Sequence, residues 1–178
     1  MRKKSPQHTK EWMVFLAETP VGSLQLYFTD RGLTALGFAG EGALLAPEPG
    51  TVPAHLKPRL EAAKRELMAY FNGSRTDFAA LTLDPQGTPF QLRVWQELRR
   101  IPWGQTISYK ELAHRVGSPK GFRAVGQANA VNPIPLIIPC HRVIAGDGSL
   151  GGYSSGLERK RWLLRHEGFR FQVPGVRI

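Results

Sequence analysis

The chain has 178 residues, enough for one domain or two small ones with a buried core, and its formal net charge is +10. Its single cysteine excludes an internal disulfide framework, and no apolar stretch is long enough to span a bilayer. The five histidines are dispersed and show no zinc-ligand spacing, so we expect neither a metal nor a cofactor.

The first residues bear a weak likeness to an export signal. Residues 2–4 are basic, but the apolar run at 12–17 is short and lies between Glu11 and Glu18. Export is therefore not expected. A single free thiol that has to stay reduced favours a cytoplasmic protein.

The N-terminal half is predicted to be a small α/β unit. Apolar and polar residues alternate within 12–38, with a turn at 30–32, which indicates β strands; the alternating residues include Leu24, Leu26 and Phe28. Residues 41–53, rich in Gly, Ala and Pro, are predicted to form a loop. A helix is expected over 56–72, with an apolar stripe that belongs to the core: Leu60, Ala63, Leu67 and Tyr70.

A linker at 84–87 is predicted to divide the chain into a domain of residues 1–87 and a domain of residues 88–178. The first part holds ten basic and nine acidic residues, whereas the second holds 14 basic and five acidic residues. The second part is therefore expected to face a polyanion, with nucleic acid as the natural partner. A basic domain with scattered solvated charge is the alternative.

The second part is predicted to be mainly helical. Thr88 and Pro89 suit the N-cap and the first position of a helix, and a last helix is expected over 157–167.

Between them, two short helices are predicted to form a helix-turn-helix. Ser108 begins the first, Glu111 completes a capping box, and Gly117 ends the helix. The second is expected over 118–130, opened by its Ser-Pro pair. Helices joined in this way place the second one in a DNA groove.

The second helix of this pair is rich in Gly and Ala and poor in side chains that read bases. Such a surface lets the backbone approach a narrow groove and leaves Arg123 as the long side chain that can probe the base stack. Tight packing of the helix explains the same small residues, so both interpretations stay open.

The only cysteine lies in the pentapeptide 139–143, directly before His141. A neighbouring imidazole lowers the pKa of a thiol and favours the nucleophilic thiolate, although a lone cysteine is more often a small buried hydrophobic residue. A stiff apolar segment at 132–138 precedes the pair, and a glycine-rich stretch at 146–156 follows it. This passage resembles the active-site signature of the O6-alkylguanine-DNA alkyltransferases, and the resemblance covers residues 88–168.

The resemblance implies a fold and a set of reacting groups. The fold class is α+β, with a small N-terminal α/β domain of the ribonuclease H-like type and then a helical winged helix-turn-helix domain. Cys140 matches the alkyl acceptor, His141 the base that deprotonates it through a water, and Glu167 the carboxylate that orients the histidine. From the residues alone, Glu167 is also readable as a surface acid at a helix end.

Three further matches concern DNA. Arg123 matches the residue that fills the gap left by an everted base, since O6 of guanine cannot be reached inside the stack. Tyr109 matches the residue that displaces the target phosphate and hydrogen-bonds the guanine; a half-buried core aromatic is the alternative. Asn132 matches the hinge asparagine that ties the recognition helix to the active-site loop.

The positions of the base pocket follow from the same resemblance. The main chain near Val143 matches a contact to the exocyclic amine, while Tyr153 and Ser154 match the pocket wall and a position that contacts O6. Two residues depart from the family. Val131 stands where relatives often carry arginine, which puts one phosphate contact in doubt, and Ser155 is small where some relatives narrow the pocket. Access for bulky adducts is therefore expected to be open.

The sequence thus predicts a two-domain DNA repair protein that transfers an alkyl group irreversibly from O6-alkylguanine to Cys140, once per molecule. The resemblance adds O4-alkylthymine as a minor substrate. The expected partner is double-stranded DNA, bound through its minor groove with the alkylguanine everted, and no membrane is involved. We expect a monomer, and cooperative binding on DNA stays open.

Two other functions remain as alternatives. The first is a non-enzymatic alkyltransferase-like damage sensor, but such relatives commonly carry tryptophan in place of the cysteine. The second is a winged-helix transcription regulator, and the shortage of base-reading side chains on the second helix stands against it.

Overall fold

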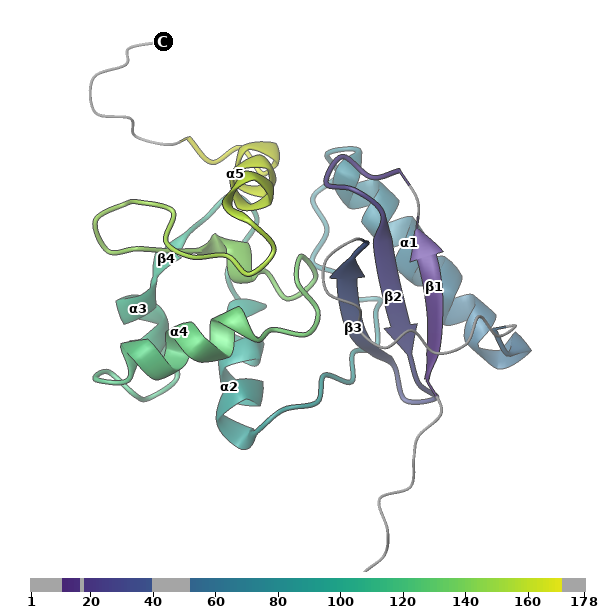
Figure 1. The fold of residues 1–178 in the computed structure, drawn as a ribbon, viewed down its shortest axis with the longest axis horizontal. Coiled ribbons are helices and arrows are strands. Elements are labelled where there is room, and N and C mark those ends of the chain that lie inside the picture. The colour runs from purple at the N-terminus through teal and green to yellow at the C-terminus, as the bar shows by residue number, and fades with distance from the viewer. Residues whose placement is uncertain (1–10, 17, 40–51, 171–178) are drawn as a thin grey trace, which may run out of the picture.

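The computed structural model describes residues 11–16, 18–39 and 52–170, so most of the loop predicted at 41–53 lies outside the described residues. Figure 1 shows a small sheet with a long helix on one side of the molecule and a group of shorter helices on the other. No helix in the described ranges is long and apolar enough to cross a membrane.

The N-terminal part is built on an antiparallel sheet. Its strands are β1 (Trp12–Leu16), β2 (Leu24–Phe28) and β3 (Leu33–Phe38), and they pair in that order. The predicted alternation is confirmed, because its members are all buried: Leu24, Leu26 and Phe28.

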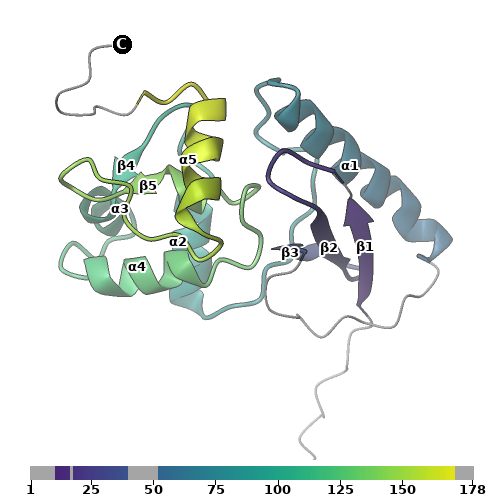
Figure 2. The same ribbon diagram turned by 45° about the horizontal axis from the view of Figure 1, so that its top comes forward.

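One long helix lies along a face of this sheet (Figure 2). It is α1 (Lys57–Phe71), preceded by the short 3-10 helix η1 (Ala54–Leu56). Its predicted apolar stripe is confirmed by the buried residues, which are Leu60, Ala63, Leu67 and Tyr70. Packing of this stripe on the inner face of the sheet makes the core of the N-terminal part.

The C-terminal part is helical and contains one short parallel sheet. Its helices are α2 (Pro89–Leu98), α3 (Tyr109–Arg115), α4 (Phe122–Ala130) and α5 (Leu157–His166). The 3-10 helix η2 (Cys140–Arg142) leads into β5 (Val143–Ile144), which pairs with β4 (Ile107–Ser108). The predicted helix pair is present as α3 and α4, and Thr88 caps α2 as predicted.

Two details of the predicted helix starts are wrong. Helix α4 does not begin at Ser118, because the N–H of Gly121 donates to the carbonyl of Ser118 at 2.8 Å and closes a turn before the helix. Ser108 caps α3 by accepting from the N–H of Glu111 at 3.1 Å. The carboxylate of Glu111 pairs with Arg115 instead of completing the capping box.

The two parts pack together next to the segment that leads to the cysteine. The carbonyl of Pro133 accepts a hydrogen bond of 2.8 Å from the N–H of Leu36 in β3. Elsewhere along the interface, Nε of Arg159 in α5 donates to the carbonyl of Val21 at 2.9 Å. The loop that carries Cys140 is therefore braced by the sheet of the N-terminal part.

Candidate active site

Cys140 begins η2, at the end of a loop that is anchored beside helix α4. The side-chain amide of Asn132, just after α4, donates to the carbonyl of Ile138 at 2.7 Å, and its oxygen accepts from the N–H of Ile134 at 3.1 Å. The N–H of Cys140 also donates to Ile138, at 2.8 Å. Asn132 therefore ties the end of α4 to the loop that leads to Cys140.

The thiol of Cys140 is enclosed, since the residue is only 1% exposed. Burial raises its pKa, because a thiolate is poorly solvated there, while a hydrogen bond with Asn132 and the charge of Lys160 act in the opposite direction. The thiol is therefore protonated at neutral pH, and it needs a base to become a nucleophile.

His141 and Glu167 form a buried pair next to this thiol. Nε2 of His141 donates to Oε1 of Glu167 at 2.8 Å, and neither side chain has exposed surface. Burial lowers the pKa of His141, and its contact with Glu167 works against that shift. The ring can accept a proton on Nδ1, which has no hydrogen-bond partner within the described ranges.

Glu167 is kept ionised by several donors. Burial alone would raise its pKa, but His141 and Arg142 hold the pKa well below its usual range. The Arg142 guanidinium donates to both carboxylate oxygens, at 2.8 and 2.9 Å, and to the carbonyl of Ile101 at 2.6 Å. The N–H of Gly104 donates at 3.3 Å, and glycine is required there because its φ is +73° and a Cβ would lie 2.7 Å from the Glu167 carbonyl oxygen.

Tyr109 begins α3 and lies half-buried beside the cysteine. Burial, followed by the charge of Cys140, raises its pKa, and a hydrogen bond with Asn129 lowers it. Its ring packs near Gly126 of α4 and against Gly151 of the glycine-rich loop, where an added Cβ would lie 3.2 Å from the ring. Tyr109 therefore lies between α4 and the glycine-rich loop near Cys140, and it also packs against the hydrophobic core.

The other predicted positions extend from the thiol to the surface. Val143 is buried in β5, Tyr153 is half-buried, and Ser154 is exposed. Arg123 is exposed in the first turn of α4, with no hydrogen-bond or ion-pair partner in the part of the chain that the structure describes. The buried members therefore gather around the cysteine, while Arg123 and Ser154 lie at the surface.

Lys160 belongs to the site, although sequence reasoning missed it. Its side chain in α5 is completely buried, and Nζ donates to the carbonyls of Val143 at 2.6 Å and Gly152 at 3.1 Å. Burial lowers its pKa to about 8, and the thiolate form of Cys140 works against this shift. A lysine three residues before the apolar Leu163, on the inward stripe of a helix, was the available signal.

Three other contributors were missed as well. Arg142 directly follows the Cys-His pair, so the motif itself offered a signal. Asn129 donates to the carbonyl of Cys140 at 3.4 Å, and the Tyr70 hydroxyl donates to Glu167 at 2.8 Å. Asn129 and Tyr70 come close to the site only in the folded chain, and no sequence motif around either residue indicates such a contact.

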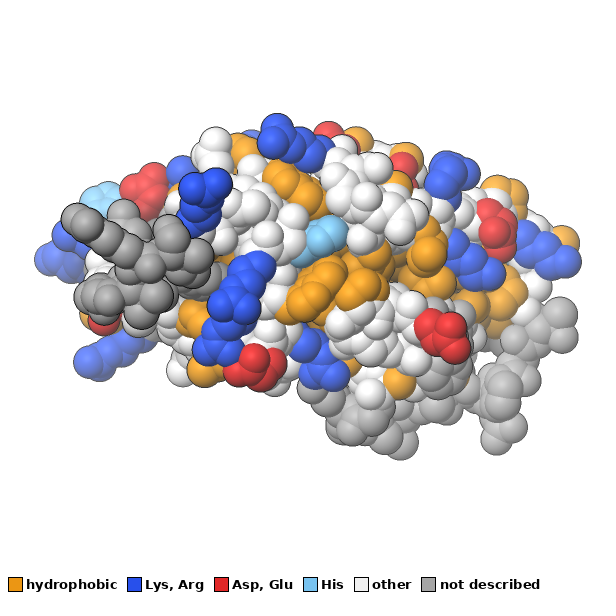
Figure 3. Space-filling view, turned by 90° about the horizontal axis from the view of Figure 1, so that it is seen from above, with side chains coloured by type: hydrophobic (Ala, Val, Ile, Leu, Met, Phe, Trp, Pro, Cys, Tyr) orange, Lys and Arg blue, Asp and Glu red, His pale blue; other side chains and the backbone are white. Residues whose placement is uncertain are grey.

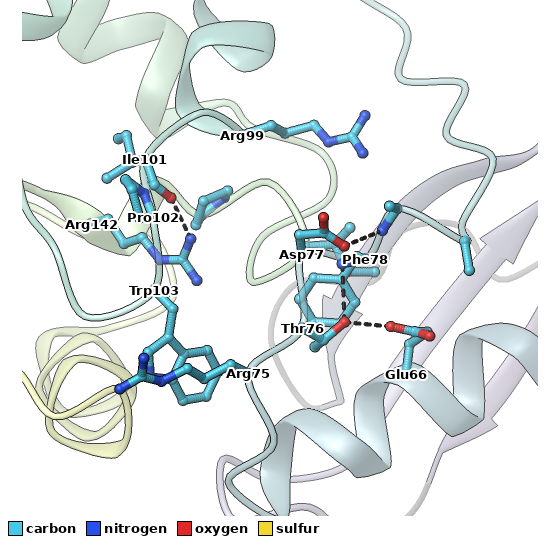
Figure 4. A pocket seen from close by; sticks show the side chains of 14 residues that line it. Glu66, Arg75, Thr76, Asp77, Phe78, Arg99, Ile101, Pro102, Trp103 and Arg142 are labelled. Atoms are coloured by element: carbon cyan, nitrogen blue, oxygen red, sulfur yellow. Dashed lines mark hydrogen bonds between the residues drawn. The ribbon is translucent and has the colours of Figure 1, made fainter.

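A cavity of about 650 Å³ lies next to Arg142, between the two parts of the chain. Arg75, Arg99 and Trp103 also line it (Figure 4). Cys140 is not among its lining residues, although Pro139 and Arg142 on either side of the Cys140–His141 pair are.

The two parts of the chain match two domains of the same known protein family. The DNA-binding domain of 6-O-methylguanine DNA methyltransferase matches residues 89–169, and the ribonuclease-like domain of the same family matches residues 14–85. The fold class expected from the sequence, a small sheet-containing domain followed by a helical DNA-binding domain, is confirmed.

Individual relatives agree with the family match. A methylated-DNA–protein-cysteine methyltransferase of Methanosarcina barkeri is 46% identical over 152 residues, which cover 85% of this chain and 94% of the relative. The constitutive one of Bacillus subtilis is 44% identical and covers 85% and 92%. The crystal structure of Mycobacterium tuberculosis OGT in complex with DNA has a TM-score of 0.74 at 41% identity, over 88% of this chain and 91% of that one. The chain therefore belongs to the 6-O-methylguanine DNA methyltransferase family, the methylated-DNA–protein-cysteine methyltransferases.

Proposed function

We propose that this chain repairs DNA by transferring an alkyl group from O6-alkylguanine to Cys140, irreversibly and once per molecule. The observation that carries the proposal is the buried His141–Glu167 pair beside a buried free thiol. The name shared by the relatives supports the reaction, and the DNA complex of the M. tuberculosis protein supports DNA as the partner.

The side chains at the site account for each step of the transfer. His141 takes the thiol proton through a bridging water, and Glu167 stabilises the imidazolium that forms. The sulfur of Cys140 then displaces guanine from the alkyl carbon, so a C–S bond forms as the C–O6 bond breaks. The departing guanine, hydrogen-bonded by Tyr109, takes up one proton and is restored, and that proton balances the one that His141 took from the thiol and gives up again. The thioether has no route back to the thiol, so each molecule reacts once.

The proposed DNA contact uses helix α4. Arg123 would fill the gap left by the everted alkylguanine, and the small residues of the helix would allow a close approach to the minor groove. The main chain of Val143, with Tyr153 and Ser154, would contact the everted base, while Asn132 fixes the loop that carries the thiol.

The same proposal includes the domain boundary, the oligomeric state, the location and a second substrate. The domain boundary is placed between residues 87 and 88, within the segment that joins the two family matches. The protein acts as a monomer in the cytoplasm, and O4-alkylthymine is a minor substrate.

Intact-mass analysis after incubation with duplex DNA that carries O6-methylguanine tests the function. One methyl group per chain is expected, on the peptide that contains Cys140, and Cys140→Ala should gain none. His141→Ala or Glu167→Gln should slow the transfer by ~10²–10⁴ with little change in DNA binding. His55→Ala, which removes an exposed histidine of the N-terminal part, is the matched control. Transfer by Cys140→Ala at the wild-type rate would exclude Cys140 as the acceptor.

Binding measurements with alkylated and undamaged duplexes, made beside the mass analysis, separate the two other functions. Tight binding of alkylated duplex without a gain in mass would indicate a damage sensor. A strong preference for one undamaged sequence would indicate a transcription regulator. The cysteine itself favours transfer over sensing, because sensors of this kind commonly replace it.

A further inference from the structure

Tyr70 lies in helix α1 of the N-terminal part, yet its hydroxyl donates a hydrogen bond of 2.8 Å to Oε1 of Glu167. The same oxygen accepts the hydrogen bond of 2.8 Å from Nε2 of His141. All three residues are buried, and Tyr70 has no exposed surface. A residue from the other domain therefore shares a carboxylate oxygen with the histidine that we propose as the base.

The charges fix the direction of this hydrogen bond. Against the effect of burial, His141 and Arg142 hold the pKa of Glu167 well below its usual range, so the carboxylate can only accept. Burial, followed by the negative charge of Glu167, raises the pKa of Tyr70 well above its usual value. The phenol therefore remains a neutral donor throughout the physiological pH range.

Aromatic contacts hold the ring of Tyr70 in place. The ring centroids of Trp103, His166 and Phe78 lie 5.0, 5.2 and 5.7 Å from its own. Nε2 of His166 also donates to the main-chain carbonyl of Tyr70 at 2.6 Å, which joins α1 to the end of α5. Figure 3, a view from above Figure 1, shows hydrophobic side chains gathered in the middle of that face. The hydroxyl is thus presented to Glu167 by a rigid support.

Several charged or titratable groups surround the His141–Glu167 pair. They are Cys140 and Arg142 of η2, Lys160 of α5, Tyr70 of α1 and, further out, Tyr109, Tyr153 and His166. Arg142 also donates to Oε1, but it comes from the same short helix as the histidine. Within the described ranges, Tyr70 is the member of this set that the N-terminal part supplies.

We propose that Tyr70 is a positioning residue through which the N-terminal domain sets the basicity of His141. This rests on the proposed function, because Tyr70 acts through the base that would deprotonate Cys140. A carboxylate oxygen that accepts from a phenol stabilises an imidazolium less strongly than the same oxygen without that donor. Without the hydroxyl, the pKa of His141 rises. The imidazole then stays protonated up to a higher pH and can act as a base only above that pH.

Tyr70→Phe tests the proposal, since it removes the hydroxyl and keeps the ring. Methyl transfer to Cys140 is followed by intact mass across the pH range, at saturating duplex DNA with O6-methylguanine, so that binding does not enter. The acid limb of the rate profile should move upward by about half a pH unit to one unit, which lowers the rate on that limb about three- to tenfold. Tyr27→Phe is the matched control and should leave the limb in place, because this 2% exposed tyrosine donates to Gln25 instead.

Two further variants test the route of the effect, and the second of them also guards against a Tyr70→Phe protein that fails to fold. In a Glu167→Gln background, the loss of the Tyr70 hydroxyl should cause no further shift, because the carboxylate through which it acts is already gone. A ring-fluorinated tyrosine at position 70 keeps the shape of the residue but donates more strongly. Its acid limb should therefore move to lower pH.

An acid limb that stays in place in Tyr70→Phe, with only a uniform fall in rate or a lower melting temperature, would make Tyr70 a structural residue and overturn the proposal. A full shift that persists in the Glu167→Gln background, or a fluorinated protein whose limb does not move, would do the same. If the wild-type protein gains no methyl group on Cys140, the proposed function fails instead, so the two failures are distinguishable.

Discussion

Nζ of Lys160 donates a hydrogen bond of 2.6 Å to the carbonyl of Val143, although the lysine has no exposed surface. Its second carbonyl partner, Gly152, belongs to the glycine-rich loop. The ammonium therefore links α5, β5 and this loop. Its positive charge also acts to lower the pKa of Cys140, against the larger effect of burial. In a poorly solvated site such a charge is an effective stabiliser of a thiolate.

Transfer is therefore expected to slow as Lys160 loses its proton. Burial lowers the pKa of Lys160 to about 8, so the ammonium is present below that pH and is lost above it. The rate at saturating DNA should fall above about pH 8. Lys160→Met should be roughly tenfold slower at neutral pH and should lack this alkaline limb.

The matched control for this prediction is Lys57→Met, which removes an exposed lysine of α1 and should keep the wild-type profile. The measurement is the pH dependence of methyl transfer followed by intact mass. If the alkaline limb persists in Lys160→Met, it belongs to another group.

Arg123→Ala should impair reaction with duplex DNA far more than reaction with a free base. Only the duplex has to give up a stacked base, and unstacking costs a few kcal/mol that an inserted side chain helps to offset. Rates with methylated duplex and with free O6-benzylguanine are compared for each protein. Arg100→Ala, which removes an exposed arginine paired with Glu97 on α2, should change neither rate. Equal losses on both substrates would assign Arg123 a structural role.

Val131 is 55% exposed at the C-terminal end of α4, at the position where the family resemblance leads us to expect an arginine. Val131→Arg should strengthen DNA binding and make the plot of log K against log salt steeper, by about 0.9 for one phosphate gained. Met68→Arg adds the same charge to a residue 44% exposed on α1, away from α4. The measurement is the DNA-binding constant of both variants as a function of salt concentration. An equal change of slope in both would attribute the gain to net charge and not to a contact at α4.

Patterns of nearby residues were sufficient to predict those helices and strands whose own sequence contains the apolar face or the capping residue. The stripe of α1 and the alternation in β2 depend on periodicity, and Thr88 at the start of α2 depends on a side chain that caps its own helix. The start of α4 was misplaced because a Ser-Pro pair suits a turn as well as a helix. The hydrogen bond from Gly121 to Ser118 decides between them, and no pattern reports it.

The residues by themselves indicate the site only where its members are neighbours in the chain, whereas distant members such as Glu167 and Tyr109 were predicted through the resemblance to a family. Cys140 and His141 are consecutive, so their chemistry is visible in the sequence. Tyr70 was correctly predicted to be buried, but periodicity does not reveal what a buried hydroxyl will bind. Lys160 was passed over because a buried lysine is rare, and its two carbonyl partners come together only when the glycine-rich loop folds back on α5.

Alkylation is expected to destabilise the protein. Cys140 is 1% exposed and belongs to the continuous core, and prolines at 133, 135 and 139 restrict the loop that carries it. Asn132 and Asn129 fix the main chain of that loop from the side of α4. A methyl group on the sulfur therefore enters a neighbourhood with little room to adjust.

Overpacking of a core commonly costs ~1–3 kcal/mol, a sizeable share of a typical total stability of ~5–15 kcal/mol. The methylated protein should melt at a lower temperature and be digested faster than the free thiol form. Melting curves of matched samples, both freed of DNA, provide the measurement, and Cys140→Ser carried through the same incubation controls for other damage. A larger fall with a benzyl group than with a methyl group would identify added volume, and not loss of the thiol proton, as the cause. A midpoint that stays the same or rises would show that the pocket accommodates the adduct, and turnover of the spent protein would then need another explanation.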